Sequence, residues 1–406
     1  MPDMSDKPTL LITVTGRDRP GVTAAIFETL AGFAVHVLDI EQIVLRGRLA
    51  LAILVTASRD LARLETAAAG TARDLGMDME FLRGEGDDPP RRDGRAHVTL
   101  LGRPLPPRAV AALTGRIADT GANIDRIVRM ARYPVTAMEL HVSGGDVARL
   151  RSVLAAEAAA QGVDVAVQQV GLLRHGRRLV VMDVDSTLLQ GEAIDLLAAR
   201  AGVGPEVAAI TEATMRGDLD FETSLRLRVA LLAGLDAAAL GEVYAAMELA
   251  PGARTLVRTL KRLGYRFGIV SGGFTALTDR LVQDLGIDYA EANVLEVVDG
   301  RITGHLVGPV VDRAAKAAAL RRFAAEAHVT LDRTVAVGDG ANDLDMLSAA
   351  GLGVAFNAKP AVQQAAHAAV NVPFLDAILY LLGISREDVE AADAEHGITT
   401  PSPAVP

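Results

Sequence analysis

Residues 180–188 read VVMDVDSTL, in which an apolar run is followed at once by two aspartates. Leu179–Met182 predicts a buried strand, and Asp183 and Asp185 stand two positions apart at its end, so both carboxylates can point to the same side. Two carboxylates beside an apolar strand repel each other and are costly to ionise unless a cation compensates them. Mg²⁺ suits such a site, because it accepts one or two carboxylates together with phosphate and water. The alternative is that one aspartate caps a following helix.

The chain beyond this stretch alternates helical spacing with more apolar runs. Continuous apolar strands separated by helices indicate a Rossmann-like α/β core around a buried parallel sheet. Such a sheet binds ligands beyond the carboxyl ends of its strands. Residues 188–260 carry few strand signals, which predicts a helical cap inserted at about 190–257. The apolar runs are Arg266–Val270, Ile287–Ala290, Thr334–Val337 and Leu352–Ala355.

Two weaker motifs fall in this α/β region. GIVSGGF at Gly268–Phe274 ends a strand, and the Ser271 hydroxyl and the Gly272 amide could hold phosphate oxygens. By itself this motif reads more readily as a simple turn. Lys316 stands on a predicted Ala-rich helix, where a lysine is ordinarily solvated, although its point charge could also neutralise a phosphate.

A stronger motif, VAVGDGANDLDML, occupies Val335–Leu347. An apolar strand again leads into a glycine loop with several carboxylates. Asp339 can complete the metal site, and Asp343 can orient a neighbouring group. The competing interpretation is a helix cap with solvated turn acids. Three acids and Asn342 at one strand end are hard to explain by packing.

The first 170 residues contain one pattern twice. Strand and helix signals follow the order βαββαβ from residue 9 and again from residue 96, and Gly16 and Gly102 occupy corresponding places. This order is the split βαβ, or ferredoxin-like, motif. The linker between the copies is charged and rich in Pro and Gly, and the end of the chain is acidic and then Pro-rich, which predicts disorder. We therefore expect small domains at 1–83 and 96–172, a linker at 84–95, an α/β domain at 173–385 and a disordered tail at 386–406.

The turn GRDRPGV at Gly16–Val22 resembles that of ACT domains, small regulatory modules that bind amino acids. The second copy reads GRPLPP at Gly102–Pro107 and lacks the Asp-Arg-Pro-Gly core. A glycine loop that feeds a helix N-terminus offers amides to a carboxylate, so the resemblance implies an amino-acid site near Gly16, Asp18 and Gly102. The bend alone also explains these glycines and prolines, in which case the doublet is structural or dimerising.

The composition excludes several classes of protein. The net charge of −10, from 41 basic and 51 acidic side chains among 406 residues, disfavours a nucleic-acid partner. The absence of cysteine rules out disulfides, thiolate metal sites and cysteine nucleophiles. The start MPDMSDKPTL does not resemble a signal peptide, and no apolar stretch reaches the roughly 20 residues of a membrane span. We expect a cytoplasmic protein with no membrane partner.

The four motifs, in this order, resemble the haloacid-dehalogenase superfamily over about 178–383. Within it, the resemblance is closest to phosphoserine phosphatases that carry two N-terminal ACT domains. It implies that Asp183 is the nucleophile, and that Asp185 protonates the leaving serine oxygen and later deprotonates the attacking water. It also implies a Mg²⁺ ion held by Asp183, the backbone carbonyl of Asp185, and Asp339. The groups implied to contact the phosphoryl group are Ser271, Gly272, Lys316 and Asn342, with Asp343 behind them.

The same resemblance implies a substrate pocket in the cap. Glu192 and Arg228 match the family residues that bind the ammonium and the carboxylate of the substrate, and Arg can clamp a carboxylate bidentately. Phe221 and Met215 match apolar neighbours of that pocket. Without the resemblance, the two charges read as ordinary solvated helix residues, and Arg226 is the nearby alternative.

Other functions remain open on the sequence. A phosphatase or phosphotransferase for another small phosphate, such as phosphothreonine, would keep the same catalytic core. An amino-acid-sensing ACT protein with a vestigial core would have no reason to keep Asp183, Asp185, Lys316 and Asp339 together. Because ACT modules commonly pair across subunits, we expect a homodimer with serine or another amino acid at the ACT interface.

Overall fold

The computed structural model describes residues 8–57, 60–85, 93–171, 174, 176 and 178–401. The chain divides into two compact units, Met1–Arg91 and Arg92–Pro406. The boundary falls inside the predicted linker 84–95, of which Gly84 and Glu85 belong to a strand and residues 86–92 lie outside the described residues. Within the described ranges, no helix is long and apolar enough to cross a membrane.

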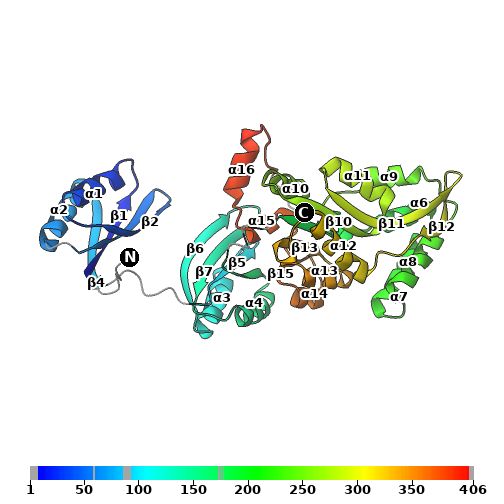
Figure 1. Ribbon diagram of the computed structural model, residues 1–406, viewed down its shortest axis with the longest axis horizontal. Helices are drawn as coiled ribbons and strands as arrows, with labels where there is room; N and C mark the ends of the chain where they lie inside the picture. The colour runs from blue at the N-terminus through cyan, green and yellow to red at the C-terminus, as the bar shows by residue number, and fades with distance from the viewer. Residues whose placement is uncertain are drawn as a thin grey trace. The chain divides into compact units, whose positions relative to one another are not determined.

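The first unit has the predicted βαββαβ order (Figure 1). Its antiparallel sheet has the strand order β2-β3-β1-β4. Leu10, Ile12 and Val14 alternate along β1 and are fully buried, because successive strand residues face opposite sides and these three face the helices. The elements are β1 (Pro8–Arg17), α1 (Val22–Ala31), β2 (Val37–Leu45), β3 (Arg48–Thr56), α2 (Leu61–Asp74) and β4 (Met77–Glu85).

The second unit begins with the second βαββαβ repeat. Its helix α4 starts where the Asp146 carboxylate accepts a hydrogen bond of 2.7 Å from the Arg149 amide, and it ends at Gly162, whose φ of 66° favours glycine. The predicted order is confirmed here too. The elements are β5 (Ala96–Gly102), α3 (Pro107–Asp119), β6 (Asn123–Ala131), β7 (Thr136–Ser143), α4 (Val147–Gln161) and β8 (Asp164–Gln169).

A Rossmann-like parallel sheet forms the centre of the second unit, as the apolar runs predict. The short strand β9 (Leu179–Met182) is fully buried and lies between β10 (Arg266–Phe274) and β13 (Thr334–Gly338). Three polar loops therefore meet at one sheet edge. The remaining strands are β11 (Tyr289–Val298), β14 (Leu352–Phe356) and β15 (Ala368–Val370), and β12 (Arg301–Val307) pairs antiparallel with β11.

The second repeat and the α/β core share one sheet of eleven strands. Strand β15 pairs antiparallel with β8 through Ala368 and Ala166. Beside this joint, the Asp164 carboxylate accepts hydrogen bonds from the amides of Asn371 at 2.6 Å and Val372 at 3.1 Å. The strand order across the junction is β14-β15-β8-β5-β7-β6. The sequence indicates two separate domains here, whereas the backbone hydrogen bonds join them.

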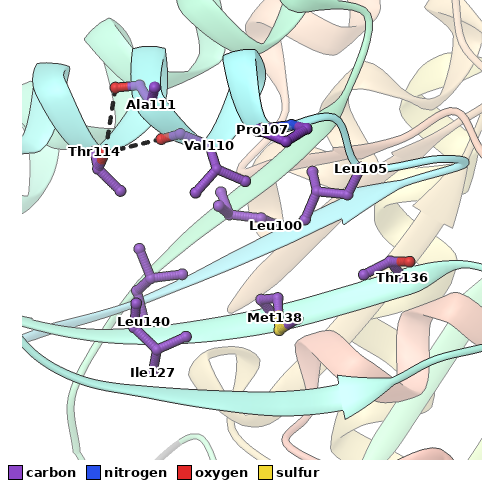
Figure 2. Close-up of a pocket in the computed structure, with 10 residues that line it drawn as sticks. All are labelled: Leu100, Leu105, Pro107, Val110, Ala111, Thr114, Ile127, Thr136, Met138 and Leu140. Carbon is purple, nitrogen blue, oxygen red and sulfur yellow. Dashed lines mark hydrogen bonds between the residues drawn. The ribbon is translucent and has the colours of Figure 1, made fainter.

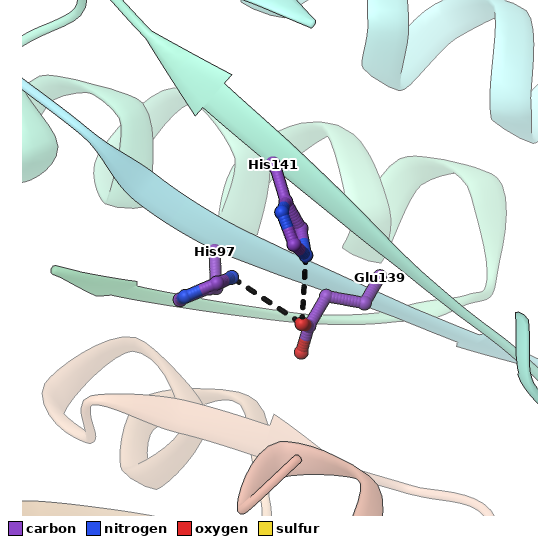
Figure 3. A group of neighbouring side chains, drawn as sticks. All are labelled: His97, Glu139 and His141. Carbon is purple, nitrogen blue, oxygen red and sulfur yellow. Dashed lines mark hydrogen bonds and ion pairs between the residues drawn. The ribbon is translucent and has the colours of Figure 1, made fainter. Parts of the chain in front are cut away.

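Polar side chains also lie between the second repeat and the core. One oxygen of Glu139 lies 3.3 Å from His97 Nδ1 and 3.2 Å from His141 Nε2 (Figure 3). Arg174 donates to both oxygens of the same carboxylate, and Gln168 donates to the Leu381 carbonyl at 2.7 Å. These groups face the core because strand alternation puts them opposite the helix-covered side of the repeat.

The predicted helical cap leaves and rejoins the core through two adjacent segments. The Gln190 amide donates to the Glu248 carbonyl at 2.8 Å, and the Ala250 amide donates to the Leu188 carbonyl at 2.9 Å. Leu295 and Ile302 of the β11–β12 hairpin are buried with the cap helices. The cap helices are α6 (Ala193–Ala201), α7 (Gly204–Arg216), α8 (Phe221–Ala230) and α9 (Ala239–Ala246).

Other helices cover the faces of the α/β sheet. Lys316 lies on α12, which begins where the Asp312 carboxylate accepts a hydrogen bond from the Ala315 amide at 2.8 Å. These helices are α10 (Ala253–Arg262), α11 (Thr275–Leu285), α12 (Arg313–Glu326), α13 (Leu344–Ala349), α14 (Pro360–Ala365) and α15 (Ile378–Leu381), with short turns at Leu331–Arg333, Ala341–Asp343 and Leu375–Ala377.

The prediction of a disordered tail at 386–406 is wrong for its first part. Helix α16 (Arg386–Glu395) starts at Ser385, whose hydroxyl accepts a hydrogen bond from the Asp388 amide. Asp393 is fully buried and accepts hydrogen bonds from Arg258 at 2.6 Å and Arg262 at 2.5 Å, both on α10. The acidic run reads as solvated because these partners lie far away in the sequence. Residues 402–406 lie outside the described residues.

Candidate active site

Asp183 stands directly after β9, at the edge where the three polar loops meet. The Val184 amide donates to Asp183 Oδ1 at 2.8 Å, which fixes the rotamer of the carboxylate. The turn Val184–Leu188 follows, in which Ser186 has a φ of 58°. This left-handed residue reverses the chain, so that Asp185 stays beside the sheet edge.

Lys316 lies at the centre of the site. Its side chain is 0% exposed, and its Nζ lies 2.7 Å from Asp183 Oδ1 and 2.7 Å from Asp343 Oδ1. Burial alone would lower the pKa of Lys316, but the negative charges of Asp183 and Asp343 outweigh burial and raise this pKa. Lys316 is therefore a permanent cation held against Asp183.

The Asp183 carboxyl has a raised pKa, chiefly because it is buried and then because Asp343 is close. Asp343 is not free to rearrange, since its second oxygen accepts a hydrogen bond from the Gly340 amide at 2.9 Å. A Cβ on Gly340 would lie 2.1 Å from Asn342 Oδ1, so a larger residue there would displace the Asn342 side chain. Asn342 is partly buried in the same turn.

Asp185 and Ser271 come together from different loops. Ser271 Oγ donates to Asp185 Oδ2 at 3.0 Å and accepts a hydrogen bond from the Gly273 amide at 2.7 Å. The Ala193 amide donates to the other Asp185 oxygen at 2.8 Å. Burial raises the pKa of Asp185, which brings this carboxyl closer to the range in which a general acid and base works.

Asp339 completes an acidic group that could hold a metal. One carboxylate oxygen each from Asp183, Asp339 and Asp343 lies within 4.8 Å of the others. Thr187 donates to Asp339 Oδ1 at 2.8 Å, and burial raises the pKa of Asp339 to about 6. Oxygen donors of this kind fit a hard divalent cation. Because both oxygens of Asp343 already accept hydrogen bonds, Asp183 and Asp339 are the better ligands.

The cap brings Glu192 and Arg228 together. Arg228 Nη1 lies 3.4 Å from Glu192 Oε2, and the two side chains are 9% and 36% exposed. Burial raises the pKa of Glu192, and the charge of Arg228 partly opposes this shift. Arg226, by contrast, is 45% exposed and pairs with Glu222 one helical turn away. The structure therefore shows that Arg228, and not Arg226, is the buried arginine beside Glu192, a distinction that the sequence alone does not make.

Two apolar cap residues lie at different depths. A Cβ on Gly272 would lie 3.1 Å from the Phe221 ring, so Phe221 packs against the glycine loop of β10. Met215 is 66% exposed, and its sulfur lies 3.5 Å from Lys359 Nζ of the core. Cap and core therefore meet beside the site.

Asn293 is a site residue that the sequence reasoning missed. It is buried on β11, donates to the Gly272 carbonyl at 2.8 Å and accepts a hydrogen bond from the Val311 amide at 2.8 Å. It thereby fixes the backbone that follows Ser271. The same strand also carries Glu291 and Glu296, so the sequence did not mark out Asn293, and its burial and hydrogen bonds appear only in the structure.

The glycines of the predicted amino-acid site are tightly packed. A Cβ on Gly16 would lie 2.4 Å from the Met77 sulfur, and one on Gly102 would lie 2.9 Å from the Pro104 carbonyl oxygen. Asp18 is exposed, and its amide donates to the Gly47 carbonyl. Packing by itself therefore explains Gly102, which lies against backbone, whereas the nearest neighbour of Gly16 is the flexible end of the Met77 side chain.

Comparisons with known proteins agree with this geometry. Residues 180–348 match the haloacid dehalogenase-like hydrolase family, and residues 8–82 and 95–168 each match an ACT domain family. The chain is thus a haloacid dehalogenase-like hydrolase with two ACT domains. It is 61% identical over 391 residues to a phosphoserine phosphatase of Streptomyces coelicolor, covering 96% of this chain and 95% of the relative. The chain belongs to the phosphoserine phosphatase family.

Two further relatives extend the comparison. Phosphoserine phosphatase SerB2 of Mycobacterium tuberculosis is 51% identical over 397 residues, which cover 96% of this chain and 97% of that protein. The crystal structure of a probable phosphoserine phosphatase from Vibrio cholerae, in unliganded form, superposes with a TM-score of 0.57 at 36% identity. That match covers 74% of this chain and 88% of the other.

The contacts of Asn293 lead to a stability prediction. Asn293→Asp keeps the shape and the acceptor for the Val311 amide but removes the donor to the Gly272 carbonyl. We expect the free energy of unfolding to fall by about 1–3 kcal/mol, the usual effect of leaving a buried polar group unpaired. Chemical denaturation measures this loss. Asn357→Asp, at an exposed position on the same sheet edge, is the control, and an equal loss in both variants would contradict the role of Asn293.

Proposed function

We propose that this chain hydrolyses O-phosphoserine to serine and phosphate through an aspartyl-phosphate on Asp183. The observation that carries the proposal is the buried contact of 2.7 Å between Lys316 and Asp183, at the edge where the other polar loops converge. A carboxylate becomes a competent nucleophile at phosphorus when cations offset its repulsion of the phosphate. The names of the relatives supply the substrate class.

Asp183 and Asp185 divide the chemistry between them. An oxygen of Asp183 attacks phosphorus, the bond from phosphorus to the serine oxygen breaks, and Asp185 gives its proton to that oxygen. Water then attacks the aspartyl-phosphate, Asp185 takes a proton from the water, and Asp183 is released. The raised pKa of Asp185 supports both steps, since the group must carry a proton in one and accept a proton in the other.

Magnesium is the cofactor that fits the acidic group. Asp183, Asp339 and the backbone carbonyl of Asp185 would hold it, and it would supply positive charge beside the phosphoryl oxygens. Asp343 serves a different purpose, because its contacts with Lys316 and the Gly340 amide occupy both of its oxygens. It positions Lys316.

Several hydrogen-bond donors near Asp183 are available to hold the phosphoryl oxygens, and Lys316, at 2.7 Å from Asp183 Oδ1, is one of them. Ser271, the Gly272 amide, Lys316 and Asn342 are the donors that we assign to the phosphoryl group. The hydrogen bond from the Gly273 amide to Ser271 Oγ keeps the hydroxyl directed toward Asp185. Ser271 and Lys316 are thus held in place before the substrate arrives, so little reorganisation of these two groups accompanies the reaction.

Glu192 and Arg228 select the amino-acid part of the substrate. They face each other at 3.4 Å, and one is an anion and the other a cation. Phosphoserine carries the complementary ammonium and carboxylate, so it can replace their mutual contact with two contacts of its own. Phe221, against Gly272, closes the apolar side of this pocket.

Asp183→Asn tests the covalent mechanism. We expect phosphate release from phosphoserine to fall at least about 1,000-fold, because an amide oxygen is a poor nucleophile. Phosphate release measures this rate, and thermal denaturation checks that the variant is folded. Asp345→Asn changes an aspartate of the motif at Val335–Leu347 whose side chain is 43% exposed and pairs with Arg313, and it should retain activity. Wild-type activity in Asp183→Asn would exclude the mechanism.

Arg228→Ala tests the choice of substrate. KM for phosphoserine should rise about 10–100-fold, since a charged hydrogen bond contributes about 1.5–3 kcal/mol. KM for p-nitrophenyl phosphate should hardly change. Arg226→Ala is the matched control and should leave both values alone. If both substrates suffer equally in Arg228→Ala, the pocket does not recognise an amino acid, and a screen of other small phosphates, phosphothreonine among them, becomes the next step.

For the ACT domains we propose a homodimer that binds serine or another amino acid at the ACT interface. Strand β2 is an edge strand with exposed apolar side chains, including Ile40, Ile43 and Leu45. Such an edge is a ready surface for a second copy. The amino-acid site near Gly16, Asp18 and Gly102 belongs to this proposal.

Ile43→Glu tests the dimer, because it places a charge in the proposed apolar interface. The dissociation constant of the dimer should rise at least about tenfold, as measured by analytical ultracentrifugation of the full chain. Leu82→Glu puts the same charge on β4, the other edge of the sheet, and should have less effect. A monomeric wild type, or a dimer that resists Ile43→Glu, would contradict this interface.

A further inference from the structure

A cavity of about 510 Å³ lies inside the second repeat, between α3 and the sheet (Figure 2). This volume is within the range of about 300–1,000 Å³ that is usual for small-molecule sites. Aliphatic side chains such as Leu100, Val110 and Met138 form most of its wall. The Thr114 hydroxyl is turned away into its own helix, where it donates to the Val110 carbonyl at 2.9 Å.

The first repeat shows why this cavity exists. The buried residues of α1 (Val22, Ile26 and Leu30) and of α3 (Ala109, Leu113 and Ile117) have the same spacing, which aligns the two helices. In this alignment Phe27 corresponds to Thr114.

The sheets agree with this alignment. Gly16 pairs with Leu49 in the first repeat, and Gly102 pairs with Thr136 in the second. Phe27 and Leu49 pack in the core of the first repeat, whereas Thr114 and Thr136 line the cavity. Two large apolar side chains are thus replaced by two small ones, and the space remains open.

A positively charged residue, Arg129, stands on β6 two positions after Ile127 of the cavity wall. Arg129 is the cross-strand neighbour of Met138, so both point to the same face of the sheet. Arg129 Nε is buried and has no hydrogen-bond partner among the described residues. The only ion pair described for its guanidinium is a long one, of 3.4 Å, to Glu387 of α16. A buried donor without a partner favours an anionic ligand group.

We propose that the second repeat binds a small aliphatic monocarboxylate, with its chain in the cavity and its carboxylate on Arg129. This cavity adjoins the glycine turn of the second repeat, because Leu105 and Pro107 of that turn line it, and none of its lining residues is among the catalytic residues. Its ligand needs no ammonium group, because no acidic side chain lines the cavity in the described structure. The ligand would lie within one repeat, in a hollow that is open to solvent beside Ile127, which is 57% exposed.

Calorimetry on the full chain with butanoate, hexanoate and octanoate tests the apolar part of the site. Affinity should rise about fourfold per added methylene, which corresponds to about 0.8 kcal/mol for each buried CH₂. Octanoate should also raise the melting temperature. No binding by the wild type, or affinities that do not depend on chain length, would overturn the proposal.

Thr114→Phe places in the second repeat the phenylalanine that the first repeat has at Phe27, so that its ring fills the cavity. It should weaken octanoate binding at least about tenfold and leave phosphatase activity unchanged. Thr66→Phe, an exposed position on α2, is the matched control and should bind octanoate normally. If Thr114→Phe does not fold, Thr136→Leu fills the cavity instead, with the leucine that the first repeat has at Leu49. If a folded Thr114→Phe or Thr136→Leu protein binds octanoate as tightly as the wild type, the cavity is not the site. The same conclusion follows if the substitution changes the oligomeric state but leaves octanoate binding unchanged.

Arg129→Ala tests the carboxylate contact. It should weaken octanoate about tenfold but leave the binding of 1-octanol unchanged, since the alcohol has the same chain without the charge. Equal losses for both ligands would show that Arg129 only supports the fold of the repeat, and this result would overturn the assignment of the carboxylate.

Discussion

The ammonium group of Lys316 lies between Asp183 and Asp343 with no exposure to solvent, and the loops of three elements converge on it. Removing one member of such a buried charge set typically costs about 3–5 kcal/mol, because the remaining charges lose their partner. The set also holds the carboxylate of Asp183, the nucleophile that we propose, in one orientation. Positions on β9, α12 and the loop after β13 are therefore constrained together.

The sequence predicted what depends on local pattern. The strand β9, both βαββαβ repeats and the gathering of Asp183, Asp185 and Asp339 followed from apolar runs and from polar residues at strand ends. The burial of Lys316 could not be predicted from its Ala-rich helix. Alanines surround Lys316 in the sequence, so no contrast between polar and apolar positions indicates which face of the helix is buried. The helix at 386–395 and the contacts of Asn293 depend on residues far away in the chain. A local pattern carries no record of such partners.

The ion pair in the cap is held less closely than the ion pairs around Lys316. Glu192 and Arg228 satisfy each other only partly, at 3.4 Å and with Glu192 still 36% exposed. A short, fully buried ion pair would compete with any ligand for the two charges. A longer, partly solvated pair loses little interaction free energy when a zwitterion inserts between its members. Asp183 and Asp185 are fixed by hydrogen bonds of 2.7–3.0 Å, so the proposed reaction centre is more tightly held than the proposed recognition pair.

The eleven-stranded sheet has a consequence for how the chain can be divided. Strand β15 has three residues, and β8 of the second repeat covers its outer edge. An enzyme fragment cut after β8 would expose that edge and the nearby apolar segment Ile378–Leu382, which is buried in the whole chain. Open strand edges beside apolar surface recruit other chains into extended sheets. The second repeat thus covers a strand edge of the catalytic domain that would otherwise be open.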